Sequence, residues 1–211
     1  MREAAEPIWA AQREHPFVLG MADGTLPPDR FAFFLKQDCL FIPAYARALA
    51  LAAGRAPWID VSVRLAENAT ALLAAELGLN RDLASEFGVS PEELVAERPT
   101  RTTRAYIDFL LRVAAVEDFA QVTAAFLPCF WGYYDVFQTL ARRARSPNHH
   151  YARWIEAYAS PTSGAKVAWF REITDRAAEE AGLWTSARLI EAFIVSSELE
   201  LAFWQMAWDG K

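Results

Sequence analysis

Three side chains that can do chemistry stand on apolar helical stretches far apart in the sequence: Asp38, Cys129 and Glu200. A thiol can attack a substrate and form a covalent intermediate, while a carboxyl group can carry protons or orient the reacting molecule. Together the three are a workable set for covalent catalysis. Each of them also has a purely structural explanation, which has to be weighed against the catalytic one.

Asp38 is the one carboxylate on the apolar face of the segment 31–54. The other members of that face are Phe31, Phe34, Leu35, Ile42, Tyr45 and Leu49. A buried carboxylate is costly, so Asp38 is either hydrogen-bonded to a neighbouring helix or arginine, or used in function. Phe41 lies one turn on, beside Asp38. Cys39 points about 100° away and is interpreted as a small core residue.

Cys129 shares the predicted buried face of the segment 124–143 with Tyr133, whereas Gly132 is predicted on the opposite face. A lone helical cysteine is usually an inert small hydrophobe, and no cationic neighbour in the sequence activates this one. Spacing alone therefore does not make it a nucleophile. Tyr106 and Tyr158 are further inward candidates by the same argument, or core tyrosines.

Helical phase separates the two acidic residues near the C-terminus. Glu200 shares a face with Phe203 and Trp204, whereas Glu198 shares one with Glu191. We therefore expect Glu200 inside and Glu198 outside. A Glu among aromatic rings suits a general acid or base, although a tyrosine hydroxyl or an arginine could equally satisfy it.

The elements that must position these groups are helices. Apolar residues recur at helical spacing through nearly the whole sequence, and no alternating run indicates a strand. We expect an all-α protein of about seven to eight helices, with residues 1–211 as a single domain. Ser90, Pro91 and Glu93 predict a helix start with a capping box.

Charge and hydropathy exclude several classes of partner. The net charge is −6, and Lys and Arg are scattered rather than gathered, so we expect no nucleic-acid binding. No window approaches the roughly 20 apolar residues of a membrane span, and the N-terminal residues are charged. We expect a soluble, cytoplasmic protein that contacts no membrane, with Cys39 and Cys129 as free thiols.

The sequence gives little support for a metal site or a phosphate-binding loop. The three histidines are His15, His149 and His150, and none has the spacing of a helical di-iron site. His15, beside a proline, is a weak candidate for a haem ligand. Gly-rich phosphate loops are absent from the sequence. We expect neither a metal nor an organic cofactor.

Three segments resemble the signature regions of the TenA/thiaminase II family. They are HPFVLGMADGTLPPDRFAFFLKQDCLFIPAYARALALAAGRA (15–56), LPCFWGYYDV (127–136) and SSELELAFWQMAW (196–208). The likeness covers nearly the whole chain. It implies a haem-oxygenase-like helical domain, usually a homotetramer, that hydrolyses aminopyrimidines in thiamin salvage or acts on thiamin itself.

The resemblance also implies roles for individual residues. Cys129 would add to the pyrimidine ring, Asp38 would hold the ring's amino group and nitrogen, and Glu200 would carry protons. The residues lining the pocket would be Phe41, Tyr106, Tyr133, Tyr158 and Phe203.

Two departures from the family pattern stand out. Phe41 occupies a position where many members have a tyrosine, and the stretch 67–80 lacks an expected histidine. Two alternatives remain beside the hydrolase: a non-hydrolytic relative, such as a quinone-cofactor oxidase or a small-molecule binding protein, and a regulatory interaction protein.

Overall fold

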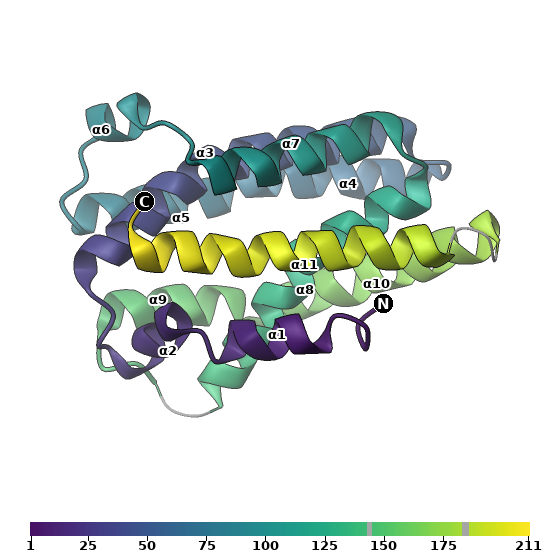
Figure 1. The fold of residues 1–211 in the computed structure, drawn as a ribbon. Helices are drawn as coiled ribbons and strands as arrows, with labels where there is room; N and C mark the ends of the chain where they lie inside the picture. Colours follow the sequence, from purple (N-terminus) through teal and green to yellow (C-terminus); the bar gives the residue numbers. More distant parts are fainter. Residues whose placement is uncertain (143–144, 183–185) are drawn as a thin grey trace. The chain divides into compact units, whose positions relative to one another are not determined.

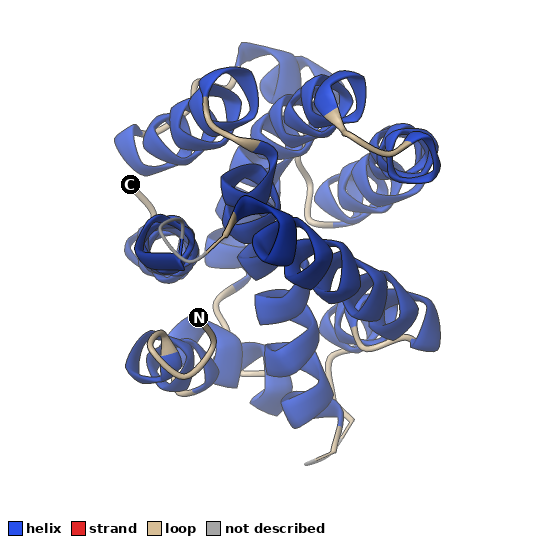
Figure 2. Ribbon diagram, turned by 90° about the vertical axis from the view of Figure 1, so that its right-hand side faces the viewer, coloured by secondary structure: helices blue, strands red, loops and turns tan. Residues whose placement is uncertain are grey.

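The computed structural model describes residues 1–142, 145–182 and 186–211. These residues form helices and loops without a strand (Figure 2), which confirms the all-α class. Within them lie eleven α-helices and one π-helical turn. Eight of the α-helices have ten or more residues, in agreement with the expected seven to eight. The three shorter ones are α1 (Glu6–Arg13), α2 (Pro16–Asp23) and α6 (Pro91–Ala96).

The chain contains two compact units. The first comprises residues 1–27 and 123–208, and the second comprises residues 28–122 and 209–211. Each unit has its own set of buried side chains and contains some of the predicted site residues.

The second unit is organised around the long helix α3 (Pro28–Arg55), which lies beside α4 (Ile59–Ala71), α5 (Leu77–Glu86) and α7 (Arg101–Val116) (Figure 1). The π-helical turn η1 (Leu72–Glu76) joins α4 directly to α5. Helix α6 begins with the predicted capping box, because Ser90 Oγ accepts the Glu93 N–H and Glu93 accepts the Ser90 N–H. The apolar face predicted for 31–54 is buried on α3.

The first unit contains α1, α2, residues 123–141 of α8 (Phe119–Ala141), α9 (His149–Tyr158), α10 (Pro161–Ala181) and most of α11 (Ser186–Asp209). Its core is rich in aromatic rings contributed by α8, α9 and α11. Helix α8 has neighbours on several sides, so that Gly132, expected on its outer face, is buried as well.

The HPF motif at the start of α2 has a structural role. His15 Nδ1 caps the helix by accepting the Phe17 N–H at 3.2 Å, and its Nε2 lies 3.2 Å from Gln205 Oε1. With Nδ1 accepting, Nε2 carries the proton and donates to Gln205. The helix ends at Gly24, whose φ of 73° is left-handed backbone that favours glycine. His15 therefore ties α2 to α11.

Two negative findings apply to the described residues. None of their helices combines the length and apolar character needed to span a membrane. No group of three or more His, Cys, Asp or Glu side chains among them could hold a metal ion.

Candidate active site

Cys129 lies in the middle of α8, directly after Pro128 and one turn before Tyr133. The helical phase predicted that Cys129 and Tyr133 are buried, but both are only half-buried. Phe126, on the same face of α8, is fully buried. Cys129 is a free thiol, as expected. A nucleophile must be accessible to its substrate, and the partial exposure of Cys129 allows such access.

Tyr133 belongs to an aromatic cluster. Its ring centroid lies 5.3 Å from that of Tyr158 on α9 and 5.0 Å from that of Trp204 on α11. Trp154 lies 4.6 Å from Tyr158, and Phe137 packs edge-on to Trp154 at 4.8 Å. Two residues predicted to line a pocket, Tyr133 and Tyr158, are thus in contact, on a cluster whose flat faces suit an aromatic ligand.

Glu200 is only 2% exposed on α11, and Phe203 is buried on the same helix. Glu198 is exposed, so the assignment made from helical phase is confirmed. Trp204, which follows Phe203, contacts Tyr133 and connects this face of α11 to the aromatic cluster. The sequence had already placed Trp204 beside Glu200, but not against the tyrosines.

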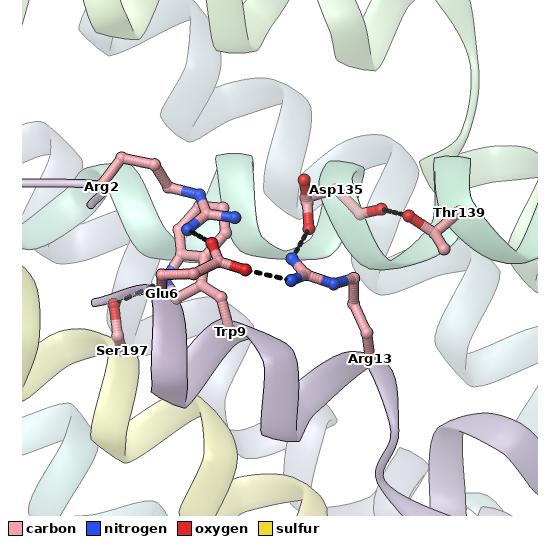
Figure 3. A network of polar contacts seen from close by, with 7 residues as sticks. All are labelled: Arg2, Glu6, Trp9, Arg13, Asp135, Thr139 and Ser197. Atoms are coloured by element: carbon pink, nitrogen blue, oxygen red, sulfur yellow. Dashed lines mark hydrogen bonds and ion pairs between the residues drawn. The ribbon is translucent and has the colours of Figure 1, made fainter. Parts of the chain in front are cut away.

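Helix α1 is hydrogen-bonded to α11 at Ser197, one turn before Glu200. Trp9 Nε1 donates to Ser197 Oγ at 2.9 Å (Figure 3). Gln12 Nε2 donates to the Ser197 carbonyl at 3.1 Å. Ser197 Oγ in turn donates to the Phe193 carbonyl, and the Trp9 ring stacks on Phe193. All four residues are fully buried, so this attachment is well shielded from water and rigid.

The same helix also holds α8 (Figure 3). Arg13 donates to Asp135 Oδ2 at 2.7 Å and pairs with Glu6, which also pairs with Arg2. Burial opposes the charge of Arg13, but the hydrogen bonds to Asp135 and Glu6 outweigh it and raise the Arg13 pKa. Hydrogen bonds from Arg13 and Arg2 lower the pKa of Glu6. Helix α1 therefore braces both the helix that carries the thiol and the helix that carries the buried carboxyl group.

In the second unit, Asp38 is 5% exposed on α3 and accepts a hydrogen bond from a residue that the sequence analysis did not identify. Asn80 Nδ2, on α5, donates to Asp38 Oδ2 at 2.5 Å, and Asn80 is completely buried. Asn80 is the last residue of the stretch 67–80, in which the family resemblance predicts a histidine. The sequence analysis noted this stretch for the absence of that histidine and assigned no role to Asn80.

Phe41 and Tyr106, both predicted to line a pocket, are in contact in the second unit. Their ring centroids lie 4.8 Å apart, and Phe41 also packs on Tyr45 at 5.7 Å. Phe41 follows Asp38 by about one turn of α3. A phenyl ring supplies a stacking face here, but no hydroxyl group.

Gln37, which directly precedes Asp38, has a structural role. Gln37 Nε2 donates to Glu97 Oε1 and to the Arg98 carbonyl, both at 3.1 Å. Its Oε1 accepts from the Thr100 N–H at 3.0 Å and from Thr103 Oγ1 at 2.7 Å. These contacts attach α3 to the start of α7, where Thr100 is the N-cap. They fix the turn of α3 that bears the buried aspartate.

Cys39, the other free thiol, is a poor nucleophile. Burial, and then the neighbouring charge of Asp38, raise the pKa of the Cys39 thiol to about 12, although the charge of Arg81 partly offsets them. At neutral pH this thiol is protonated. The sequence interpretation of Cys39 as a small core residue is only partly correct, because the side chain is half-buried rather than fully buried.

The predicted site residues therefore fall into two sets. Cys129, Tyr133, Tyr158, Glu200 and Phe203 belong to the first unit, and Asp38, Phe41 and Tyr106 belong to the second. Within each set the structure reveals supporting residues that the sequence analysis missed. They are Trp9, Gln12, Phe137, Trp154, Ser197 and Asn80.

A family model described as TENA/THI-4/PQQC family matches residues 2–210. The chain belongs to this family. It is 36% identical to the aminopyrimidine aminohydrolase of Halalkalibacterium halodurans, over 99% of this chain and 94% of that protein. It is 34% identical to the aminopyrimidine aminohydrolase of Bacillus subtilis, over 98% of this chain and 87% of that protein.

Solved structures agree with the family assignment. A TenA homologue from P. horikoshii superimposes with a TM-score of 0.92 at 33% identity, covering 100% of this chain and 97% of that one. A domain with a heme oxygenase-like fold from Shewanella denitrificans superimposes with a TM-score of 0.78 at 13% identity, covering 99% of this chain and 90% of that one. The resemblance to the TenA family and the expected haem-oxygenase-like fold are thus both confirmed.

Proposed function

We propose that this protein is an aminopyrimidine aminohydrolase that acts in thiamin salvage. Its substrate is 4-amino-5-aminomethyl-2-methylpyrimidine or thiamin, and its product is 4-amino-5-hydroxymethyl-2-methylpyrimidine. The observation that carries the proposal is full-length similarity to two aminopyrimidine aminohydrolases in a chain that places a half-buried thiol one turn from an aromatic cluster.

The proposed chemistry is covalent catalysis by Cys129. The thiolate adds to a carbon of the pyrimidine ring and makes the ring electron-rich enough to expel the amine from the exocyclic methylene. Water then adds to the methylene, and the carbon–sulfur bond breaks to restore the aromatic ring. Glu200 protonates the departing amine and takes a proton from the incoming water, which one carboxyl group can do in sequence.

The remaining residues bind the substrate in this proposal. Asp38 accepts hydrogen bonds from the ring's amino group and from a protonated ring nitrogen, because a carboxylate has two acceptor oxygens. Aromatic side chains stack on the pyrimidine. These are Phe41, Tyr106, Tyr133, Tyr158 and Phe203. Phe41 in place of a tyrosine makes this contact purely apolar.

The proposal extends to the organisation of the protein. Residues 1–211 act as one functional domain, and the protein works in the cytoplasm as a homotetramer. The match of one family model to residues 2–210 supports the single functional domain. Sedimentation of the purified protein at micromolar concentration measures its oligomeric state directly.

The proposed function is tested by a hydrolysis assay in which each variant has a matched control. The purified protein is incubated with each substrate, and the hydroxymethyl product is quantified by chromatography. Cys129→Ser is compared with Cys39→Ser, and Glu200→Gln with Glu198→Gln. We expect losses of roughly 10³-fold or more for Cys129→Ser and about 10²- to 10⁴-fold for Glu200→Gln, with both controls active.

Two outcomes would overturn the proposal. Absence of turnover by the wild type on either substrate would favour a non-hydrolytic or regulatory relative. Equal activity of Cys129→Ser and Cys39→Ser would remove the thiol from the mechanism while leaving the substrate assignment intact.

A further inference from the structure

We propose that Asn80 is a positioning residue for Asp38, and that through Asp38 it sets the affinity of the protein for the aminopyrimidine ring. The inference rests on the proposed function and adds a residue to it. Asn80 Nδ2 donates to Asp38 Oδ2 at 2.5 Å, between helices α5 and α3. A hydrogen bond to one carboxylate oxygen fixes the plane of the group, and hence the direction in which both oxygens accept.

The backbone places Asn80 through a local irregularity. The inward stripe of α4 continues into η1 and then into α5. Its buried residues are Val61, Leu65, Ala69, Leu72, Leu77, Asn80 and the adjacent pair Leu83 and Ala84. Steps of three or four residues lead from one turn to the next except between Leu72 and Leu77, where the π-helical turn introduces a step of five.

Without that turn, a different residue would face α3. A regular α-helix with 3.6 residues per turn would continue the stripe from Leu72 to Glu76 and Leu79. Those two residues are only partly buried, whereas Asn80 is fully buried. π-helical turns are rare and are frequently found at functional sites. Here the turn brings a side-chain amide to the buried carboxylate.

The chemistry of an amide suits this position. A carboxylate taken out of water needs hydrogen bonds to offset its lost hydration, and Asn80 supplies one. A lysine or arginine would also satisfy the carboxylate, but it would bring a positive charge that competes with the substrate's amino group and protonated ring nitrogen. Asn80 orients Asp38 without adding a charge, which leaves the negative charge available for recognition.

The test compares three substitutions with a distant control. Asn80→Leu keeps the approximate size and removes the donor, Asn80→Asp keeps the shape and replaces the donor with an acceptor, and Asn80→His restores a donor. The control is Asn68→Leu, on α4, where the amide contacts the Arg64 carbonyl. For each variant, kcat and KM for the aminomethylpyrimidine, the Kd of the hydroxymethyl product by calorimetry, and the melting temperature are measured.

We expect Asn80→Leu and Asn80→Asp to raise both KM and the product Kd by roughly 10- to 100-fold, the effect of a hydrogen bond to a charged group. Asn80→His should recover most of the affinity, and Asn68→Leu should match the wild type. If Asn80→Leu does not fold, Asn80→Asp and Asn80→His still decide the question.

A purely structural role would give a different result. Unchanged KM and product Kd in folded Asn80→Leu or Asn80→Asp, with only a lower melting temperature, would overturn the inference while the wild type remained active. A wild-type protein that neither turns over the substrate nor binds the product would instead overturn the proposed function, and with it this role of Asn80.

Discussion

Iodoacetamide should modify Cys39 far more slowly than an ordinary thiol. The reagent reacts with the thiolate, and burial together with the charge of Asp38 raises the Cys39 pKa from 9.0 to about 12. At pH 8 the ionised fraction falls from about one in ten to about one in 10⁴, a loss of about 1000-fold.

The lower ionised fraction is partly offset by the greater reactivity of a more basic thiolate. With a Brønsted coefficient of about 0.4 to 0.5, a shift of about three pKa units raises the intrinsic reactivity by roughly 15- to 30-fold. The net expectation is modification of Cys39 about 30- to 60-fold more slowly than an unperturbed thiol, before any further slowing by restricted access.

The assay isolates each thiol in turn. In Cys129→Ser protein only Cys39 remains, and the mass increase from alkylation at pH 8 gives its rate against free cysteine. In Cys39→Ser protein only Cys129 remains, and loss of hydrolase activity should follow its alkylation. Rapid modification of Cys39, at the rate of free cysteine, would refute the reasoning from burial and charge.

Three further substitutions test the supporting contacts. Trp9→Phe removes the donor to Ser197 and should lower the free energy of unfolding by at least about 1 kcal/mol, measured by urea denaturation. Gln37→Leu leaves several buried polar groups unsatisfied and should lower the free energy of unfolding by about 2 to 4 kcal/mol, also measured by urea denaturation. An unchanged free energy of unfolding would show that the hydrogen bonds of Gln37 do not stabilise the fold. The pKa of Glu6 is lowered chiefly by the hydrogen bond from Arg13, so its contribution to stability is present above pH 4.5 and is lost as the pH falls through the folded-state pKa. Glu6→Gln should therefore melt below the wild type at pH 7, and the gap should close in acid; a gap independent of pH would contradict this origin.

Helical periodicity correctly predicted burial where the position of a residue on its own helix decides whether it is exposed. It placed Glu200 inside and Glu198 outside because a regular helix turns about 100° per residue over the whole of that segment. The same periodicity overestimated the burial of Cys129 and missed that of Gly132. Exposure on a helix with several neighbours depends on where those neighbours pack, which its own sequence does not specify.

The residues that the sequence analysis missed depend on contacts between distant segments or on irregular backbone. Trp9 and Ser197 are 188 residues apart, and nothing in the local pattern of either segment indicates their hydrogen bond. Asn80 becomes buried only because the π-helical turn shifts the phase of the helix, so a regular 3.6-residue pattern assigns that position to Leu79.

The most direct test of the central claim is the ratio of two initial rates. Cys129→Ser and Cys39→Ser differ from each other only in which thiol is kept, so changes in cysteine count and protein preparation cancel. With 4-amino-5-aminomethyl-2-methylpyrimidine as substrate, we predict that Cys129→Ser forms the hydroxymethyl product at less than about 1/1000 of the rate of Cys39→Ser. A ratio near one would contradict nucleophilic catalysis by Cys129.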